Sequence, residues 1–171
     1  RGSSILVSGT AGTGKTSIAS AIAGSTRYAF RMLNAATDTK KDLQVVAEEA
    51  KMSGTVILLL DEVHRLDKTK QDFLLPHLES GRLILIGATT ENPSFEVISA
   101  LLSRAQVYVL QALSEAELNQ LFERTQQLAL PDVAFDDAVR ERIVGYADGD
   151  ARRLLNVLEQ LQTAAQTAHV T

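Results

Sequence analysis

The sequence predicts an α/β fold, in which a parallel five-stranded sheet flanked by helices is followed by a small unit of three helices. Up to about residue 113, short apolar runs typical of strands alternate with longer stretches typical of helices. After that point, only helical stretches follow one another. We therefore expect two domains, an α/β core over residues 1–113 and a helical domain over residues 114–171.

Five apolar runs are predicted to form the strands, at residues 4–8, 28–35, 55–62, 82–90 and 107–113. The run at 55–62 gives the strongest signal, because it is continuously apolar and ends in two acids. This pattern is typical of a central parallel strand that is covered on both faces. The run at 82–90 repeats the buried pattern, whereas the last run alternates less cleanly.

The segments between these runs are predicted to form helices, at residues 15–24, 40–52, 69–79 and 95–103. The second helix gathers its apolar residues on one face, namely Leu43, Val46, Ala47 and Ala50. In the third helix, we expect Pro76 to bend or interrupt the helix, because proline lacks a backbone N–H.

The helical domain is expected to begin at a capping box. Ser114 is a suitable N-cap, and Glu117 follows three residues later. This helix should run to about residue 128, and two more should follow near 136–147 and 150–168.

Composition and hydropathy limit the class of protein. Of the 171 residues, 45% are hydrophobic and 5% aromatic, so aliphatic side chains must fill the core. The absence of cysteine excludes a disulfide framework and a cysteine-based zinc site. The net charge of −4 is not that of a domain that wraps a polyanion over its whole surface, although it leaves room for a local basic face.

No apolar run approaches the roughly 20 residues of a membrane span. No signal peptide is visible either, so we expect a cytoplasmic protein with no membrane partner. The chain begins at Arg1, directly before the first expected strand, and we expect it to be part of a longer chain.

A phosphate-binding loop is predicted where the first strand meets the first helix. Residues 9–16 read GTAGTGKT and satisfy the pattern G-x-x-x-x-G-K-[ST] between a strand and a helix. Glycines let successive backbone N–H groups turn toward phosphate oxygens, and the helix adds its positive end. Lys15 would reach the β- and γ-phosphates, and the Thr16 hydroxyl would bind Mg²⁺. The residues expected to contact ATP are Gly9, Gly12, Thr13, Gly14, Lys15, Thr16 and Ser17.

Polar residues at two other strand ends complete the predicted site. Asp61 would hold Mg²⁺, usually through water, and Glu62 would orient or deprotonate an attacking water. Thr89 or Thr90 would hydrogen-bond the γ-phosphate or the water, but threonine also simply favours strands. His64 lies nearby in the sequence, yet it has no partner ligands for a metal, and we interpret it as a structural or surface residue.

Residues 55–113, with the segments DEVHR, GATTENPSFE and ALLSRA, resemble the core of an AAA+ ATPase of the clamp-loader clade. More narrowly, they resemble the replication-associated recombination protein A (RarA/MgsA) family, and the likeness continues through GDARRLLNVLE at 149–159. The resemblance implies a P-loop NTPase fold with a helical lid. It also implies an ATPase that acts on DNA in replication, recombination or repair at stalled forks.

The resemblance also implies roles for single residues. Asp61 and Glu62 fall on the Walker B pair, and Thr90 falls on sensor 1. Arg104 falls on the arginine that enters a neighbouring subunit's active site, and Arg152 falls on sensor 2 in the lid. Asn34 corresponds to the polar residue that holds the catalytic glutamate away from water. Without the resemblance, both arginines would be interpreted as surface cations.

The chain departs from the family in its glycine loop. Thr10 and Ala11 replace two prolines, and the wording of residues 1–20 is similar to KaiC- and RecA-type ATPases. Such an ATPase is one alternative, and a nucleotide-sensing or scaffold module with negligible turnover is another. A Walker B strand directly beside the phosphate-loop strand would argue against AAA+. The implied partners are ATP, further copies of the chain, DNA, and replication or repair proteins.

Overall fold

The computed structural model describes residues 4–90 and 105–168. The chain divides into two compact units. The first contains Arg1–Gly9 and Gly14–Leu110, and the second contains Thr10–Thr13 and Gln111–Thr171.

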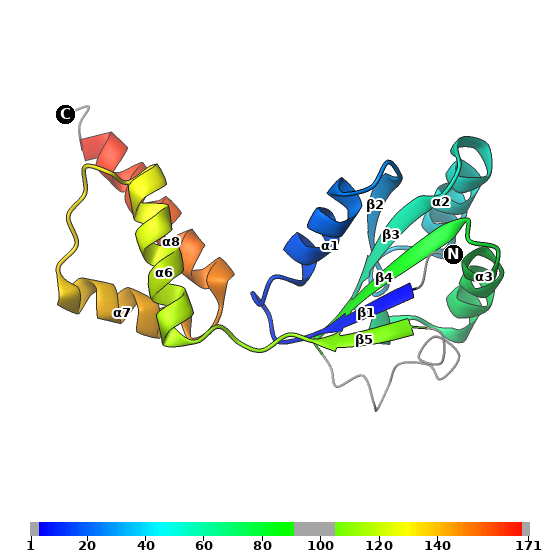
Figure 1. The fold of residues 1–171 in the computed structure, drawn as a ribbon, viewed down its shortest axis with the longest axis horizontal. Coiled ribbons are helices and arrows are strands. Elements are labelled where there is room, and N and C mark those ends of the chain that lie inside the picture. The colour runs from blue at the N-terminus through cyan, green and yellow to red at the C-terminus, as the bar shows by residue number, and fades with distance from the viewer. Residues whose placement is uncertain (1–3, 91–104, 169–171) are drawn as a thin grey trace. The chain divides into compact units, whose positions relative to one another are not determined.

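The first unit contains a five-stranded parallel sheet (Figure 1). Its strands are β1 (Ser4–Ser8), β2 (Ala29–Asn34), β3 (Val56–Asp61), β4 (Leu83–Thr89) and β5 (Ala105–Val109). They lie in the order β2-β3-β4-β1-β5, and every neighbouring pair is parallel. β4 therefore separates β3 from β1, which is the arrangement expected for AAA+.

Helices cover both faces of this sheet, with α1 on one face and α2 and α3 on the other (Figure 1). Their bounds are α1 (Lys15–Gly24), α2 (Lys40–Ser53) and α3 (Lys68–Glu79), and a 3₁₀ turn, η1 (Val63–Arg65), follows β3. Alternate residues of β3 serve the two faces. Leu58 and Leu60 pack in the cluster that contains the α2 and α3 side chains, whereas Ile57 and Leu59 pack with Ala19 of α1.

Two expectations for the helices have different outcomes. The predicted apolar face of α2 is buried, since Leu43, Val46, Ala47 and Ala50 are each at most 5% exposed. Pro76 was expected to bend or interrupt α3, and the interruption is wrong, because the helix continues through Pro76 to Glu79. A proline removes only one hydrogen bond of the helix, and fully buried Leu74 in the preceding turn anchors the segment to the core.

The last strand differs from its prediction. It was expected over residues 107–113 but forms at Ala105–Val109. Among the described strands β5 pairs with β1 alone, which has five residues, and the register runs from Ser4 opposite Ala105 to Ser8 opposite Val109. Beyond this register, the Leu110 N–H still donates to the Ser8 carbonyl at 2.6 Å, but β1 ends at Ser8, so the strand does not continue to residue 113. The short helix expected at 95–103 lies outside the described residues.

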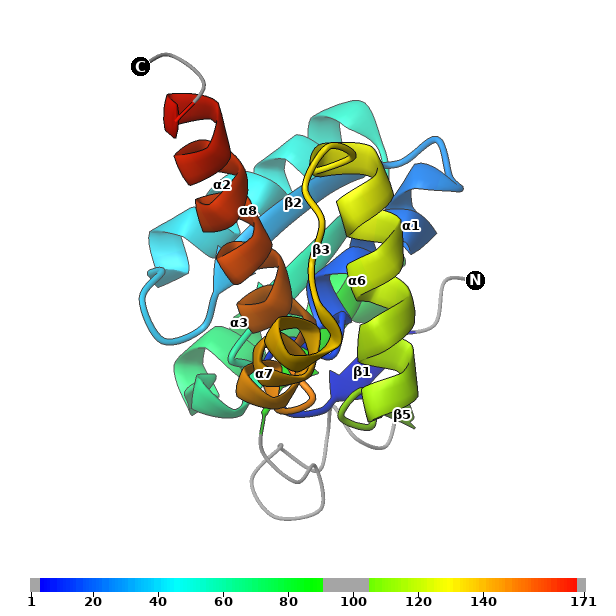
Figure 2. The same cartoon turned by 90° about the vertical axis from the view of Figure 1, so that its left-hand side faces the viewer.

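The second unit contains α6 (Glu115–Ala129), α7 (Asp137–Ala147) and α8 (Ala151–Ala168), which pack against one another (Figure 2). Ser114 and Glu117 form the predicted capping box of α6. The core of this unit includes Phe122 and Leu154, both fully buried, and Phe122 meets the Phe135 ring edge-on at 5.1 Å between centroids.

Candidate functional site

The predicted site residues of the first unit gather at one edge of the sheet. In a parallel sheet, the carboxyl ends of all strands lie at the same edge. β1, β4 and β3 are consecutive neighbours there, and each is followed by predicted site residues. A backbone hydrogen bond joins two of these ends, since the Gly9 N–H donates to the Thr89 carbonyl at 3.1 Å.

The start of α1 is unlike that of the other α-helices in the described ranges 4–90 and 105–168. Its N-cap is Gly14, which offers no capping side chain, and its first turn holds no acidic residue. The other α-helices begin at polar side chains that cap them, namely Thr39 with Asp42, Asp67, Ser114, Asp136 and Asp150. The first N–H groups of a helix need an external acceptor. The start of α1 is therefore suited to an anion.

Two glycines of the loop adopt a backbone conformation that favours glycine. Gly12 has a φ of 72° and Gly14 a φ of 98°, in the left-handed region that residues with a Cβ rarely adopt. The Lys15 ammonium donates to the Gly9 carbonyl at 2.8 Å, so its Nζ lies over the loop. Thr16 is half-buried in the first turn of α1, and Ser17 beside it is exposed.

The acidic pair lies at the end of β3. Asp61 and Glu62 are both half-buried, and the Asp61 carboxylate accepts a hydrogen bond from the Glu62 N–H at 2.8 Å. Glu62 has a φ of 49° and a ψ of 43°, which is unusual for a residue with a side chain. Such strained backbone occurs at functional sites more often than elsewhere.

The donor set suits a magnesium ion that is bound mainly by a nucleotide. Among residues 4–90 and 105–168, no group of three His, Asp or Glu side chains gathers to hold a metal by itself. Mg²⁺ commonly takes one or two protein oxygens and completes its shell with phosphate and water. The Thr16 hydroxyl and the Asp61 carboxylate match this requirement in their chemistry.

The two threonines at the end of β4 have different environments. Thr89 is 1% exposed, and its Oγ1 lies 2.7 Å from His64 Nδ1, with which it shares a hydrogen bond. Thr90 follows it and is exposed. Of the two threonines, only Thr90 is therefore exposed to solvent at the carboxyl edge of the sheet.

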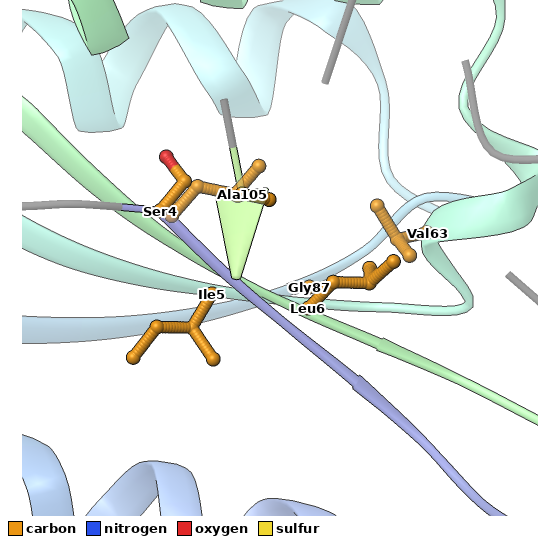
Figure 3. A pocket seen from close by; sticks show the side chains of 7 residues that line it. Ser4, Ile5, Leu6, Val63, Gly87 and Ala105 are labelled. Carbon is orange, nitrogen blue, oxygen red and sulfur yellow. The ribbon is translucent and has the colours of Figure 1, made fainter. Parts of the chain in front are cut away.

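The turn after Glu62 packs closely on β4 (Figure 3). Val63 is fully buried. A Cβ added to Gly87 would lie 3.2 Å from Val63 Cγ2 and 2.9 Å from Leu6 Cδ1. A small apolar cavity of about 10 Å³ remains beside these residues, and Ser4, Ile5, Leu85 and Ala105 complete its lining. A space of this size holds at most one water molecule, so it is a packing void.

In the second unit, the loop residues 10–13 meet the start of α8. The Ala151 N–H donates to the Gly12 carbonyl at 3.1 Å. The Asp150 carboxylate caps α8 by accepting from the Arg152 N–H at 2.8 Å, and a Cβ at Gly12 would overlap this carboxylate. The Arg152 side chain is exposed.

Two further predicted residues stand apart. Arg104 lies outside the described residues. Asn34 pairs with Asp61 across β2 and β3, but its Oδ1 accepts from the Ala36 N–H at 2.8 Å in a local turn. Asn34 therefore lies at the end of β2 beside β3, and its side-chain oxygen serves the local turn.

Sequence reasoning missed the contacts of His64 and Asp150. The predicted helix start near residue 150 was a signal for Asp150, because aspartate is a favoured N-cap. The contact between His64 and Thr89 joins residues 25 positions apart, and it follows from the β3–β4 register.

The comparisons with known proteins agree with this geometry. Residues 5–113 match the family described as "ATPase family associated with various cellular activities (AAA)". Replication-associated recombination protein A of Bacillus subtilis (strain 168) is 52% identical over 162 residues, which are 92% of this chain and 38% of that protein. The Escherichia coli (strain K12) protein of that name is 40% identical over 172 residues, again 38% of its length. "ATPase WRNIP1" of Dictyostelium discoideum is 41% identical over 91% of this chain and 19% of that protein.

Solved structures confirm the fold class. A Thermotoga maritima RuvB P216G mutant superposes with a TM-score of 0.80 at 24% identity, over 98% of this chain and 57% of that chain. The structure entitled "Thermotoga maritima RuvB Holliday junction branch migration motor" gives a TM-score of 0.78 at 24% identity, over 98% and 56%. The P-loop NTPase (AAA+) architecture is thus shown, and the predicted likeness to replication-associated recombination protein A is confirmed. The chain spans 38% of the length of these bacterial relatives.

Proposed function

Because this chain belongs to the ATPase family associated with various cellular activities (AAA), we propose that it binds ATP with Mg²⁺ and hydrolyses it. The observation that carries the proposal is the uncapped start of α1 beside Lys15, at the sheet edge where the acidic pair also lies. Three phosphates need several N–H donors and a cation in a small volume, and this edge offers both.

We assign roles from this arrangement and from the family resemblance. Gly9, Gly12, Thr13, Gly14, Lys15, Thr16 and Ser17 cradle the phosphates. Thr16 and Asp61 hold the metal, which would neutralise charge on the transferring phosphoryl group. Glu62 orients and deprotonates the attacking water, and exposed Thr90 contacts that water or the γ-phosphate.

Two arginines complete the proposed mechanism. Arg152 at the start of α8 contacts the γ-phosphate from the helical lid of the same chain. Arg104 enters the site of a neighbouring copy and stabilises the charge that develops during transfer. In this mechanism, the domains are an α/β core over residues 1–113 and a lid over residues 114–171. ATP binds between subunits and draws the core and the lid together.

The wider role rests on the names of the relatives. We propose a cytoplasmic homo-oligomer that acts with DNA, and with replication or repair proteins, at stalled forks. None of the helices in the described part of the chain is both long and apolar enough to cross a membrane.

Glu62→Gln tests hydrolysis separately from binding. The amide keeps the size of the side chain but cannot accept a proton, so turnover should fall by roughly 10²–10⁴-fold while ATP affinity is retained. Steady-state phosphate release and equilibrium binding of ATP with Mg²⁺ measure the two quantities. The control is Glu141→Gln, at an exposed position of α7. Turnover of Glu62→Gln equal to that of the wild type would contradict the proposal, and negligible turnover of the wild type itself would favour a nucleotide sensor.

A further inference from the structure

A side-chain hydrogen bond links the turn that follows Glu62 to the end of β4. His64 is the central residue of η1, and its Nδ1 lies 2.7 Å from Thr89 Oγ1. Thr89 is 1% exposed, so its hydroxyl is held in a fixed place. Thr90, the proposed sensor, is the next residue. His64 therefore connects the segment of the proposed base with the segment of the proposed sensor.

The backbone at Glu62 is held in an unfavourable conformation. Its left-handed conformation, with φ at 49°, is unfavourable for a residue that carries a Cβ. Within the turn, the Arg65 N–H donates to the Glu62 carbonyl at 2.8 Å, and the Asp61 carboxylate accepts from the Glu62 N–H. These bonds shape the turn locally, but they do not fix its position against β4.

Burial already anchors the turn to the core. Val63 is fully buried and Leu66 is 5% exposed, and the Gln71 amide donates to the Leu66 carbonyl at 3.0 Å. These contacts hold the turn on the sheet without help from His64. The hydrogen bond between His64 and Thr89 also restrains the orientation of the turn, because a hydrogen bond fixes both the distance and the angle between two groups.

We propose that His64 is a positioning residue, which holds the Glu62 turn in register with the β4 end so that the Glu62 carboxylate faces the γ-phosphate and Thr90. The inference rests on the proposed function, since it assigns Glu62 the role of base.

The test compares His64→Leu with His64→Asn. Leucine removes the hydrogen bond, whereas the asparagine amide can place a polar atom where Nδ1 lies in histidine. The control is His77→Asn in α3, where the ring packs on Phe73 and lies outside the site. ATPase activity per molecule is first measured against protein concentration, and steady-state rates are then compared at the plateau, where this activity no longer rises. ATP binding and circular dichroism are measured in parallel.

His64→Leu should lower kcat by about 10- to 100-fold, because a small misplacement of the base costs turnover. KM and the ATP dissociation constant should stay within about 2-fold, since no phosphate contact is lost. His64→Asn should recover most of kcat, and His77→Asn should match the wild type. Unchanged kcat in folded His64→Leu, or an equal loss of ATP affinity, would overturn the inference.

Thr89→Val is an independent test of the same hydrogen bond. It removes the same hydrogen bond from the other side, so it should reproduce the loss in kcat, and the double variant with His64→Leu should be no slower than either single one. In NMR spectra of the nucleotide-free protein, Thr89→Val should also shift the His64 ring nitrogens and the Glu62 amide. Additive losses in kcat, or unshifted signals, would contradict a shared role.

These measurements distinguish a failure of the inference about His64 from a failure of the proposed function. If the wild type hydrolyses ATP but His64→Leu does so equally well, only the inference about His64 fails. If the folded wild type shows no turnover at its plateau concentration, the proposed function fails, and the role of His64 fails with it.

Discussion

At the scale of single residues, Gly87 matters for the site because it has no side chain, which lets neighbouring side chains approach its backbone closely. Gly87 lies in β4, and the side chains of Leu6 in β1 and Val63 in η1 both lie close to the position that a Cβ would take. A Cβ there would lie 2.9 Å from Leu6 Cδ1, closer than carbon atoms pack in proteins. The absence of a side chain therefore lets the turn that follows Glu62 lie on the sheet.

Gly87→Ala should destabilise the protein by about 1–3 kcal/mol, because Leu6 and Val63 must shift to admit a methyl group. Urea denaturation followed by circular dichroism measures this loss. Gly24→Ala is the matched control, since a Cβ at this helical position meets nothing within 4 Å. The control should be neutral or stabilising by up to about 1 kcal/mol. Equal stability of the two variants would show that the packing at Gly87 is looser than described.

At the scale of helices and strands, the sequence specifies elements well where a local rule decides them. The apolar run of β3 and the one-sided apolar face of α2 follow from residue spacing alone, and both were predicted within two residues of their observed ends. The end of β5 was not predictable in this way, because it depends on the length of β1, its partner in the sheet. The contact of His64 with Thr89 was missed for the same reason, since pairing between strands decides it.

The capping box of α2 gives this element a pH dependence. The backbone N–H of Thr39, and then its hydroxyl, donate to the Asp42 carboxylate and hold its pKa below the ordinary value of 3.8. A carboxyl with a lowered pKa stabilises the folded state above its ordinary value, and this contribution is lost as the pH falls through the lowered pKa. Asp42→Asn should therefore be less stable than the wild type near neutral pH.

This difference in stability should shrink as the pH falls below 3.8. Urea denaturation at a series of pH values measures it. The control is Asp72→Asn, at an exposed position of α3. A difference between Asp42→Asn and the wild type that is constant with pH would argue that the carboxylate does not stabilise α2 through its charge.

At the scale of the whole molecule, the fold was predictable from the sequence, whereas assembly was not. The family match covers the α/β core over residues 5–113, and the superposition on RuvB covers 98% of the chain, including the three helices. The chain spans 38% of its bacterial relatives, so its assembly and its action on DNA remain proposals. They depend on surfaces between copies, which residue spacing within one chain does not encode.

If Arg104 acts in a neighbouring copy, ATPase activity per molecule should rise with protein concentration. Arg104→Ala should lower the plateau rate by roughly 10³-fold or more while ATP binding persists, because the arginine acts on the transition state. ATPase rates across a dilution series measure this, with Arg142→Ala on the exposed face of α7 as the control. A loss of ATP affinity in monomeric Arg104→Ala would count against action between copies.

The most direct test of the central claim is calorimetric titration of the folded chain with ATP and Mg²⁺. The wild type should bind with measurable heat, as should the control Lys41→Ala at an exposed position of α2. Lys15→Ala should lose binding while keeping its circular dichroism, because the loop then lacks its only cationic side chain. No heat from the folded wild type, or unchanged affinity in Lys15→Ala, would contradict the claim that the start of α1 holds a polyphosphate.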